Sequence, residues 1–382
     1  MIGYRMPTRV HIEPGANLRL PEAARSLGLS SALLVVDQGV RRHTRWTETA
    51  ERLLQETGIR VQIFDEVEQN PRTSTVTRLA EKMREEKLDG VVGLGGGSVI
   101  DAAKAAAMLA DNEQRIEQYE GKNRYAKPPR PFIAVPTTCG TGSEVTWVSV
   151  LTIESIKTKI SVKGESMFPS FALVDADLLQ SLPAELVAYT GADALTHALE
   201  CTTCLAANPV SDALAEKAIA LLFQNLARAA ENIEEDEEAR EAVMRASTLA
   251  GMAFTNADVA AVHCLSESIG GFYDLPHGKL NAILLEPVLR YSRDAIAGRL
   301  AKLDVSVFGS DPRSPQKERV DHFFGELQSL TQKLRIPAFS TLPVPKEDHR
   351  RIAEAATRNG SNRSNAQPMS VSSYLELLGS LA

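Results

Sequence analysis

The chain has 382 residues, more than one ordinary core holds, so we expect two domains. Hydrophobic residues make up 43% and charged residues 24%, both near the averages of globular proteins, which excludes disorder as the main state. The 42 Lys and Arg against 49 Asp and Glu give a net charge of −7. That balance argues against nucleic acid and anionic membranes as partners, because binding to phosphate requires excess positive charge.

The sequence gives no sign of secretion or of membrane insertion. The first residues, MIGYRMPTRVHIEPGA, lack the apolar run of a secretory signal, and no apolar stretch is long enough to span a bilayer. The 4 cysteines are too few for a disulfide scaffold, and the single C-x-x-C at 201–204 is interpreted as ordinary thiols. We therefore expect a cytoplasmic protein that acts on a small molecule bound in a cleft.

In the first half, short apolar runs typical of buried strands alternate with amphipathic segments typical of helices. This alternation predicts a Rossmann-like α/β domain with a doubly wound parallel sheet over residues 1–181. The expected strands are 31–36, 60–64, 90–94 and 131–135, and the expected helices are 44–57, 73–87 and 99–110.

Beyond Pro183 the strand signals nearly vanish, and a proline at that point suits a first helical turn. The second half is therefore predicted to be an all-α domain over residues 182–382. Its expected helices are 183–204, 211–230, 237–255, 259–271, 294–307, 315–334 and 346–358.

A glycine-rich turn, GLGGGSVID at 93–101, follows the third expected strand and opens a helix. Glycines let the backbone approach a bulky anion, and the free N–H groups of a helix start carry partial positive charge. We count Gly96, Gly97, Ser98 and Asp101 as candidate residues for binding a cofactor diphosphate. The alternative is a plain tight turn, because the pattern is not a full G-x-G-x-x-G and does not follow the first strand.

Polar residues also end the first and fourth expected strands. Asp37 could hydrogen-bond a ribose diol, and its charge would repel a 2′-phosphate, which favours NAD over NADP. The alternative for Asp37 is a helix cap or turn former. The turn PTTCGTGSE after the fourth strand offers Thr137, Thr138 and Thr141 where open α/β sheets bind ligands, although a simple loop remains the alternative.

Four residues in the second half have the chemistry of a metal site. Asp193 and His197 lie four apart, which on a helix places both side chains on one face. Alone, such a pair is more often a surface or capping pair, and His263 in its apolar segment could be a core histidine. With His277 the set offers one carboxylate and three imidazoles, which suits Fe²⁺ or Zn²⁺ with a position open for substrate.

Together, the segments GGGSVIDAAKAAA, PTTCGTGSEVT, GADALTHALE and VHCLSESIGGFYDLPHG resemble the iron-containing (group III) alcohol dehydrogenase family over essentially the whole chain. The resemblance implies the dehydroquinate synthase-like fold, with an NAD(P)-binding first domain and a metal-binding helical domain. It implies that the metal ligands are Asp193, His197, His263 and His277, and that nucleotide contacts fall on Gly96, Gly97, Ser98, Thr137, Thr138, Thr141, Asn70 and Lys159.

By this resemblance we expect a metal-dependent, NAD(H)-linked oxidoreductase that interconverts a small alcohol and its aldehyde or ketone, as a homodimer or larger homo-oligomer. The alternatives are a metal- and NAD-dependent lyase of the dehydroquinate synthase kind, a maleylacetate-reductase-like reductase and a non-catalytic sensor. Maleylacetate reductases usually lack the metal-binding aspartate, whereas Asp193 is present here. Glycerol dehydrogenases carry a GGGK-type turn rather than GGGS.

The chain departs from the family pattern at two places. Many members have a second histidine where Glu267 stands, and residues 361–368 (SNRSNAQP) lack the usual NPR-like motif. His277 and Glu267 are our candidate catalytic residues, with Glu267 acting as acid/base, binding a substrate hydroxyl or amine, or only orienting a metal ligand. We expect Trp147, Val148, Phe254 and Glu267 to flank the substrate, although each of the three apolar residues could be simple packing.

Overall fold

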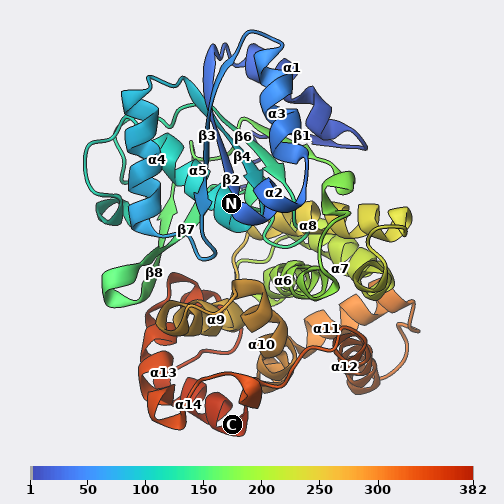
Figure 1. Ribbon diagram of the computed structural model, residues 1–382. Helices are drawn as coiled ribbons and strands as arrows, with labels where there is room; N and C mark the ends of the chain where they lie inside the picture. The colour runs from blue at the N-terminus through green and yellow to red at the C-terminus, as the bar shows by residue number, and fades with distance from the viewer. Residues whose placement is uncertain (1–2, 382) are drawn as a thin grey trace. The chain divides into compact units, whose positions relative to one another are not determined.

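The computed structural model describes residues 3–381, which form two compact units (Figure 1). One unit spans Met6–Leu182, and the other contains residues 183–381 together with residues 3–5. Among the described residues, no helix combines the length and the apolar character needed to cross a membrane.

The first unit is built on a six-stranded parallel sheet in the order β1-β9-β6-β4-β2-β3. This order places the strands β2, β4 and β6 side by side, so that their carboxyl ends lie at one edge of the sheet. The strands are β1 (Arg9–Ile12), β2 (Ser31–Asp37), β3 (Arg60–Val67), β4 (Gly90–Gly95), β6 (Phe132–Pro136) and β9 (Phe171–Val174).

Both faces of the sheet are covered by helices, which explains why its strands are continuously apolar. Along β2, Leu33 and Val35 belong to the core beneath α4 and α5, whereas Leu34 and Val36 belong to the core beneath α1 and α3. The helices of this unit are α1 (Leu20–Ser26), α2 (Gln38–His43), α3 (Trp46–Gln55), α4 (Thr73–Glu85) and α5 (Gly97–Leu109). The predicted parallel α/β fold is confirmed.

A small second sheet, whose two longer strands follow the fourth predicted strand, was not expected from the sequence. Strand β7 (Val148–Ile153) pairs antiparallel with β8 (Thr158–Lys163), and β5 (Gly121–Lys122) pairs with β8. In Figure 1 the β7–β8 hairpin projects from its unit beside α4 and α5. The short strands β1, at the edge of the main sheet, and β9, beside it, also lie outside the predicted set.

The second unit is helical throughout its elements, as predicted. Two of its helices, α10 and α14, were not foreseen. Pro287 lies inside α10, and a proline in an apolar run resembles a helix end in the sequence. The helices are α6 (Ala184–Thr203), α7 (Pro209–Glu231), α8 (Glu237–Phe254), α9 (Ala261–Tyr273), α10 (His277–Tyr291), α11 (Arg293–Phe308), α12 (Gln316–Lys333), α13 (His349–Arg358) and α14 (Val371–Leu381).

Candidate cofactor and metal sites

The two polar turns of the first unit follow neighbouring strands. The register pairs Gly95 at the end of β4 with Pro136 at the end of β6, and the amide of Thr137 donates to the carbonyl of Gly95 at 3.0 Å. Asp37 ends the adjacent strand β2. The sheet order therefore brings the glycine turn, the threonine turn and Asp37 to the same edge, where doubly wound sheets bind ligands.

The glycine turn and the threonine turn are in direct contact. A Cβ on Gly96 would lie 3.1 Å from Cγ2 of Thr138, and a Cβ on Gly97 would lie 2.4 Å from Cγ2 of Thr141. The latter distance is far below van der Waals contact, so only glycine fits there. Helix α5 begins at Gly97 and presents its free N–H groups beside the threonine hydroxyls. The two turns thus form one cradle with the chemistry of an anion site.

A buried ion pair fastens the second turn to α5. The ammonium of Lys104, 1% exposed, lies 3.7 Å from the Asp101 carboxylate and donates to the carbonyls of Ser143 at 2.9 Å and Val148 at 2.7 Å. Asp101 accepts from the Ser143 hydroxyl and from the amide of Val150. Because both Asp101 oxygens contact the chain itself, its contribution to a cofactor site would be through the turn that it holds. Burial lowers the pKa of Lys104 to about 8.

Asp37 caps the helix that follows its strand. Its Oδ1 accepts from the amide of Val40 at 2.9 Å, as in an N-cap. The capping alternative is therefore present in the structure. Oδ2 accepts no hydrogen bond from residues 3–381, which leaves that oxygen available for a ribose hydroxyl.

The structure brings Asn70 and Lys159 together, although they lie 89 residues apart. The Lys159 ammonium donates to Oδ1 of Asn70 at 2.8 Å. Asn70 has a positive φ of 53°, an unusual backbone conformation for a residue that is not glycine. The hydrogen bond connects the loop after β3 to the β7–β8 hairpin.

In the helical unit, Asp193, His197, His263 and His277 form one cluster. Each offers a ligand atom, and these atoms all lie within 4.8 Å of one another. The Asp193 carboxylate is 3.8 Å from ring nitrogens of both His197 and His277. Asp193, His197 and His263 are buried, whereas the side chain of His277 is 25% exposed. Four ligand atoms about 2.0–2.2 Å from a tetrahedral Zn²⁺ ion lie about 3.4 Å from one another, so the cluster must contract to bind such an ion.

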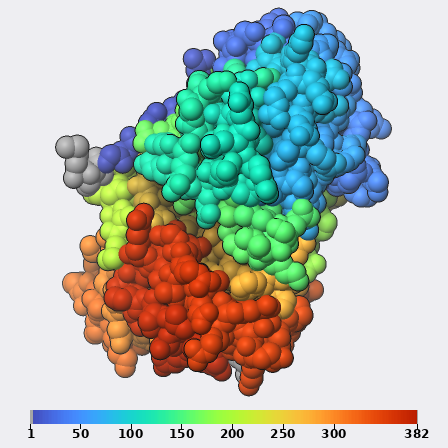
Figure 2. All heavy atoms as spheres, turned by 90° about the vertical axis from the view of Figure 1, so that its left-hand side faces the viewer, coloured from blue at the N-terminus to red at the C-terminus, as the bar shows by residue number. Residues whose placement is uncertain are grey.

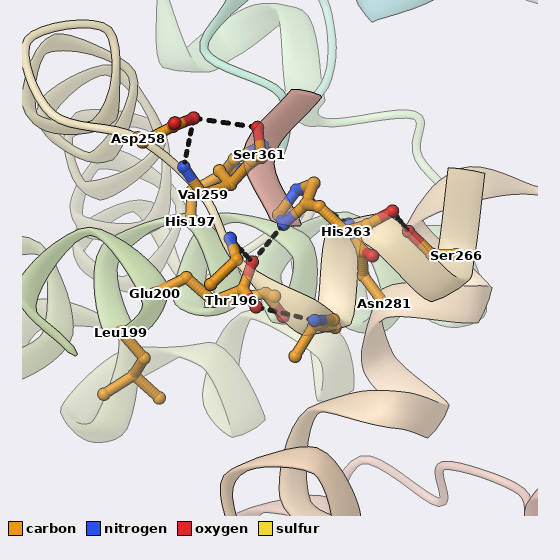
Figure 3. Close-up of polar contacts among 12 residues, drawn as sticks. Thr196, His197, Leu199, Glu200, Asp258, Val259, His263, Ser266, Asn281 and Ser361 are labelled. Atoms are coloured by element: carbon orange, nitrogen blue, oxygen red, sulfur yellow. Dashed lines mark hydrogen bonds and ion pairs between the residues drawn. The ribbon is translucent and has the colours of Figure 1, made fainter. Parts of the chain in front are cut away.

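Glu200 fixes the orientation of His263 (Figure 3). The Glu200 carboxylate accepts from Nδ1 of His263 at 2.6 Å and from the amides of Ala260 at 2.8 Å and Val262 at 2.7 Å. A carboxylate only accepts, so Nδ1 carries the hydrogen and Nε2 keeps a lone pair for the cluster. Burial alone would lower the pKa of His263, but the hydrogen bond and charge of Glu200 raise it overall.

Asn281 lies among the cluster residues and is fully buried. Its Nδ2 is 2.5 Å from Oδ1 of Asp193 and 3.1 Å from Nε2 of both His263 and His277. These contacts show that the Asp193 carboxylate and the Nε2 atoms of both histidines point at the same region. The carbonyl Oδ1 of Asn281 is buried and has no hydrogen-bond partner among residues 3–381. Asn281 is thus part of the site, one turn after His277 on α10.

Glu267 follows His263 by one turn of α9 and is held by an amide. Nδ2 of Asn359, in the segment after α13, donates to Oε2 of Glu267 at 2.6 Å. The same segment is tied down by Ser361, whose hydroxyl donates to Asp258 at 2.8 Å, a contact drawn in Figure 3. The stretch 361–368 therefore supplies a polar anchor where the usual family motif is absent.

The apolar residues predicted to flank the substrate are divided between the two units. The ring of Trp147 lies under the ammonium of Lys122 at 4.5 Å, and the carbonyl of Val148 accepts from Lys104. In the helical unit, the Phe254 ring stacks on the imidazole of His197 with centroids 4.3 Å apart. Phe254 therefore forms an apolar wall of the cluster.

Sequence reasoning missed several residues of these sites. Glu200 and Asn281 carry a signal that was available, because each follows a proposed ligand at a helical spacing of three or four residues. Lys104 follows Asp101 at the same spacing, on a helix so rich in alanine that its burial could have been suspected. Asn359 carried no such signal, since it is far from Glu267 in the sequence.

A parallel α/β unit followed by a helical unit with an Asp/His cluster is the architecture expected of a metal-dependent enzyme with the dehydroquinate synthase-like fold. Residues 7–176 match the family model described as iron-containing alcohol dehydrogenase, and residues 187–382 match the C-terminal model of the Fe-containing alcohol dehydrogenase family. The chain belongs to the iron-containing alcohol dehydrogenase family.

Relatives support this assignment along the full chain. The 1,3-propanediol dehydrogenase of Klebsiella pneumoniae is 36% identical over 96% of this chain and 95% of its own. The NAD-dependent methanol dehydrogenase of Bacillus methanolicus is 32% identical over 99% of both chains. A solved structure of a 1,3-propanediol oxidoreductase has a TM-score of 0.95 and 35% identity, and covers 100% of both chains. This chain is an oxidoreductase that interconverts an alcohol and its aldehyde with a nicotinamide cofactor.

Proposed function

We propose that the chain oxidises a short alcohol, or reduces its aldehyde, with a divalent metal held by Asp193, His197, His263 and His277. The observation that carries the proposal is the convergence of the four ligand atoms within 4.8 Å in a buried site. Fe²⁺ and Zn²⁺ both suit one carboxylate and three imidazoles. Such an ion, when bound, supplies a Lewis acid that favours the alkoxide form of the alcohol oxygen.

The chain's own residues prepare this chemistry. Glu200 keeps the hydrogen of His263 on Nδ1, which leaves Nε2 directed at the cluster. Phe254 covers the face of His197 and limits the access of water to it. His277 is the most exposed member, so we place the substrate oxygen on its side. An acid/base role of Glu267 remains an alternative that the variants below test.

We propose NAD(H), rather than NADP(H), as the hydride carrier. The cradle of Gly96, Gly97 and Ser98 against Thr138 and Thr141 supports a diphosphate site. The available oxygen of Asp37 would bind a ribose diol and repel a 2′-phosphate. A clear kinetic preference for NADPH over NADH would contradict this assignment, and Asp37→Ser should narrow the preference for NADH.

Metal analysis combined with an NAD(H) assay over alcohols and aldehydes tests the main proposal. His263→Ala should lose the ion and turnover while NAD still binds, and His322→Ala, outside the cluster, serves as the control. Full activity of His263→Ala, or of protein stripped by a chelator, would contradict the metal site. Net production of NADH from a simple alcohol separates this function from the lyase alternative. The homo-oligomeric state stays a prediction, which light scattering checks.

A further inference from the structure

Three carboxylates act electrostatically on His263, namely those of Glu200, Asp193 and Glu267. Two of these three carboxylates already have another role. Glu200 accepts three hydrogen bonds from the chain, and Asp193 belongs to the proposed metal ligands. Glu267 differs, because Asn359 donates to Oε2 and no group within residues 3–381 donates to Oε1. Glu267 therefore carries a carboxylate oxygen beside the cluster that is available to a ligand.

Asn359 cannot turn its amide over without losing contacts. Its Oδ1 accepts from the backbone amide of Ser361 at 2.9 Å, while Nδ2 donates to Glu267. Two serines anchor the segment itself, since Ser361 and Ser364 both donate to the Asp258 carboxylate. In the space-filling view of Figure 2 the C-terminal part of the chain, coloured red, forms part of the outer surface of its unit. A segment anchored through two buried serines thus orients the Glu267 carboxylate.

Resting on the proposed function, we propose that Glu267 determines substrate specificity by accepting a hydrogen bond from a second donor group of the substrate, a hydroxyl or an ammonium. Residues four apart on a helix have Cβ atoms about 5–6 Å apart, which a three-carbon alcohol spans. One end of such a substrate reaches the metal ligands while its far end reaches Glu267. Alcohols with a carboxylate at the far end are disfavoured by the charge of Glu267.

A panel of short primary alcohols of similar size tests this inference. We compare kcat/KM for 1,3-propanediol, 3-amino-1-propanol, 3-hydroxypropanoate and the neutral reference 1-butanol. The amine stays protonated near neutral pH, as a lysine side chain does. The wild type should prefer the diol and the amine over 1-butanol and should use the anion worst. A charge-assisted hydrogen bond predicts a preference of about tenfold or more for the amine.

Glu267→Gln gives the sharpest outcome, because Asn359 decides which way the new amide points. The Gln carbonyl must accept from Nδ2 of Asn359, so its NH₂ group faces the substrate. The substitution thereby converts an acceptor into a donor. Relative to 1-butanol, we expect the preference for the amine to fall about tenfold or more and the use of 3-hydroxypropanoate to rise.

Two further variants complete the experiment. Asn359→Ala frees the carboxylate without removing it, so selectivity should weaken but not reverse. Glu318→Gln removes the same charge from an exposed position on α12 and should leave the whole panel unchanged. Metal content and thermal melting establish that each variant is folded and loaded.

Different results of this experiment would contradict the proposed function and the role of Glu267. If the wild type produces no NADH from any panel member while loaded with metal, the proposed function is wrong. If it oxidises 1-butanol well but shows the same ranking in Glu267→Gln, Glu267 does not contact the substrate and the inference is overturned. An equal loss on all four substrates would assign Glu267 to acid/base chemistry and would also overturn it.

Discussion

The carboxylate of Glu200 on α6 receives the Nδ1 hydrogen of His263 on α9 at a distance of 2.6 Å. The same carboxylate accepts from the amides of Ala260 and Val262, at the start of α9. One buried side chain therefore fixes the beginning of α9 and the rotation of its histidine ring. Since Asp193 and His197 lie on α6 as well, Glu200 joins the two helices that supply three of the four proposed ligands.

Replacing Glu200 by Gln should weaken metal binding by about 10–100-fold, because the contacts that orient metal-bound histidines have effects of that size. An amide offers one accepting oxygen in place of two, so the three donors can no longer all be satisfied. Competition with a chelator measures the affinity directly. Glu237→Gln, at an exposed position in the same unit, is the control, and equal affinity in both variants would contradict the orienting role of Glu200.

Asn281→Ala should also lower the affinity for the ion. Its Nδ2 holds the Asp193 carboxylate at 2.5 Å and contacts two of the histidines, so its removal lets these side chains relax before the ion binds. Asn225→Ala is a matched control, since this asparagine is also buried and donates to the Leu221 carbonyl away from the cluster. Similar loss of stability in both variants, with lost affinity in Asn281→Ala alone, is the expected result. Unaltered affinity would show that Asn281 only fills space.

The features that can be predicted from the sequence are those with a repeating pattern or with a short spacing along the chain. Continuous apolar runs identified the central strands because both faces of the sheet are covered, and the spacing of Asp193 and His197 identified a shared helical face. Long-range pairs carry no such pattern. The bond from Asn359 to Glu267 joins residues 92 apart, so only the folded chain reveals it.

Helix α10 was not predicted from the sequence, and the reason is physical. Helix α10 contains Pro287, which lacks an N–H and usually ends a helix, so the apolar run after His277 did not suggest one. This affects the site, because Asn281 can be recognised as a neighbour of His277 only when both residues are placed on one helix. A missed helix thus concealed a buried residue of the cluster.

Gly97→Ala should weaken NAD binding while leaving the metal site intact. The added Cβ would meet Cγ2 of Thr141 at 2.4 Å, so the two turns must separate and the cradle opens. Gly298→Ala is the control, because a Cβ there meets open space. Titration of NADH fluorescence measures the affinity, for which we expect a loss of about tenfold. If NADH affinity and metal content both stay at the wild-type level, the contact between the turns does not shape the nucleotide site.

Lys104→Met should destabilise the protein, because it leaves Asp101 without its buried partner. Breaking such a pair costs about 3–5 kcal/mol, and urea unfolding at neutral pH measures the loss. Lys127→Met, at an exposed position in the same unit, is the control. The double variant Lys104→Met with Asp101→Asn should recover part of the stability, since it removes the unpaired charge as well. No recovery would indicate that the hydrogen bonds of the ammonium, rather than the charge pair, hold the turn.

The pH dependence of stability provides an independent check on Lys104. Burial lowers its pKa from 10.5 to about 8 in the folded state. Between these values the unfolded chain binds more protons than the folded one, so the free energy of unfolding contributed by this group rises with pH through the window. Below about pH 8 the cost of burying the ammonium is fully present. The wild type should therefore gain up to about 3 kcal/mol relative to Lys104→Met between the two pKa values. Parallel stability curves for the two proteins would show that Lys104 titrates normally, and its ion pair with Asp101 would then offset the cost of burial.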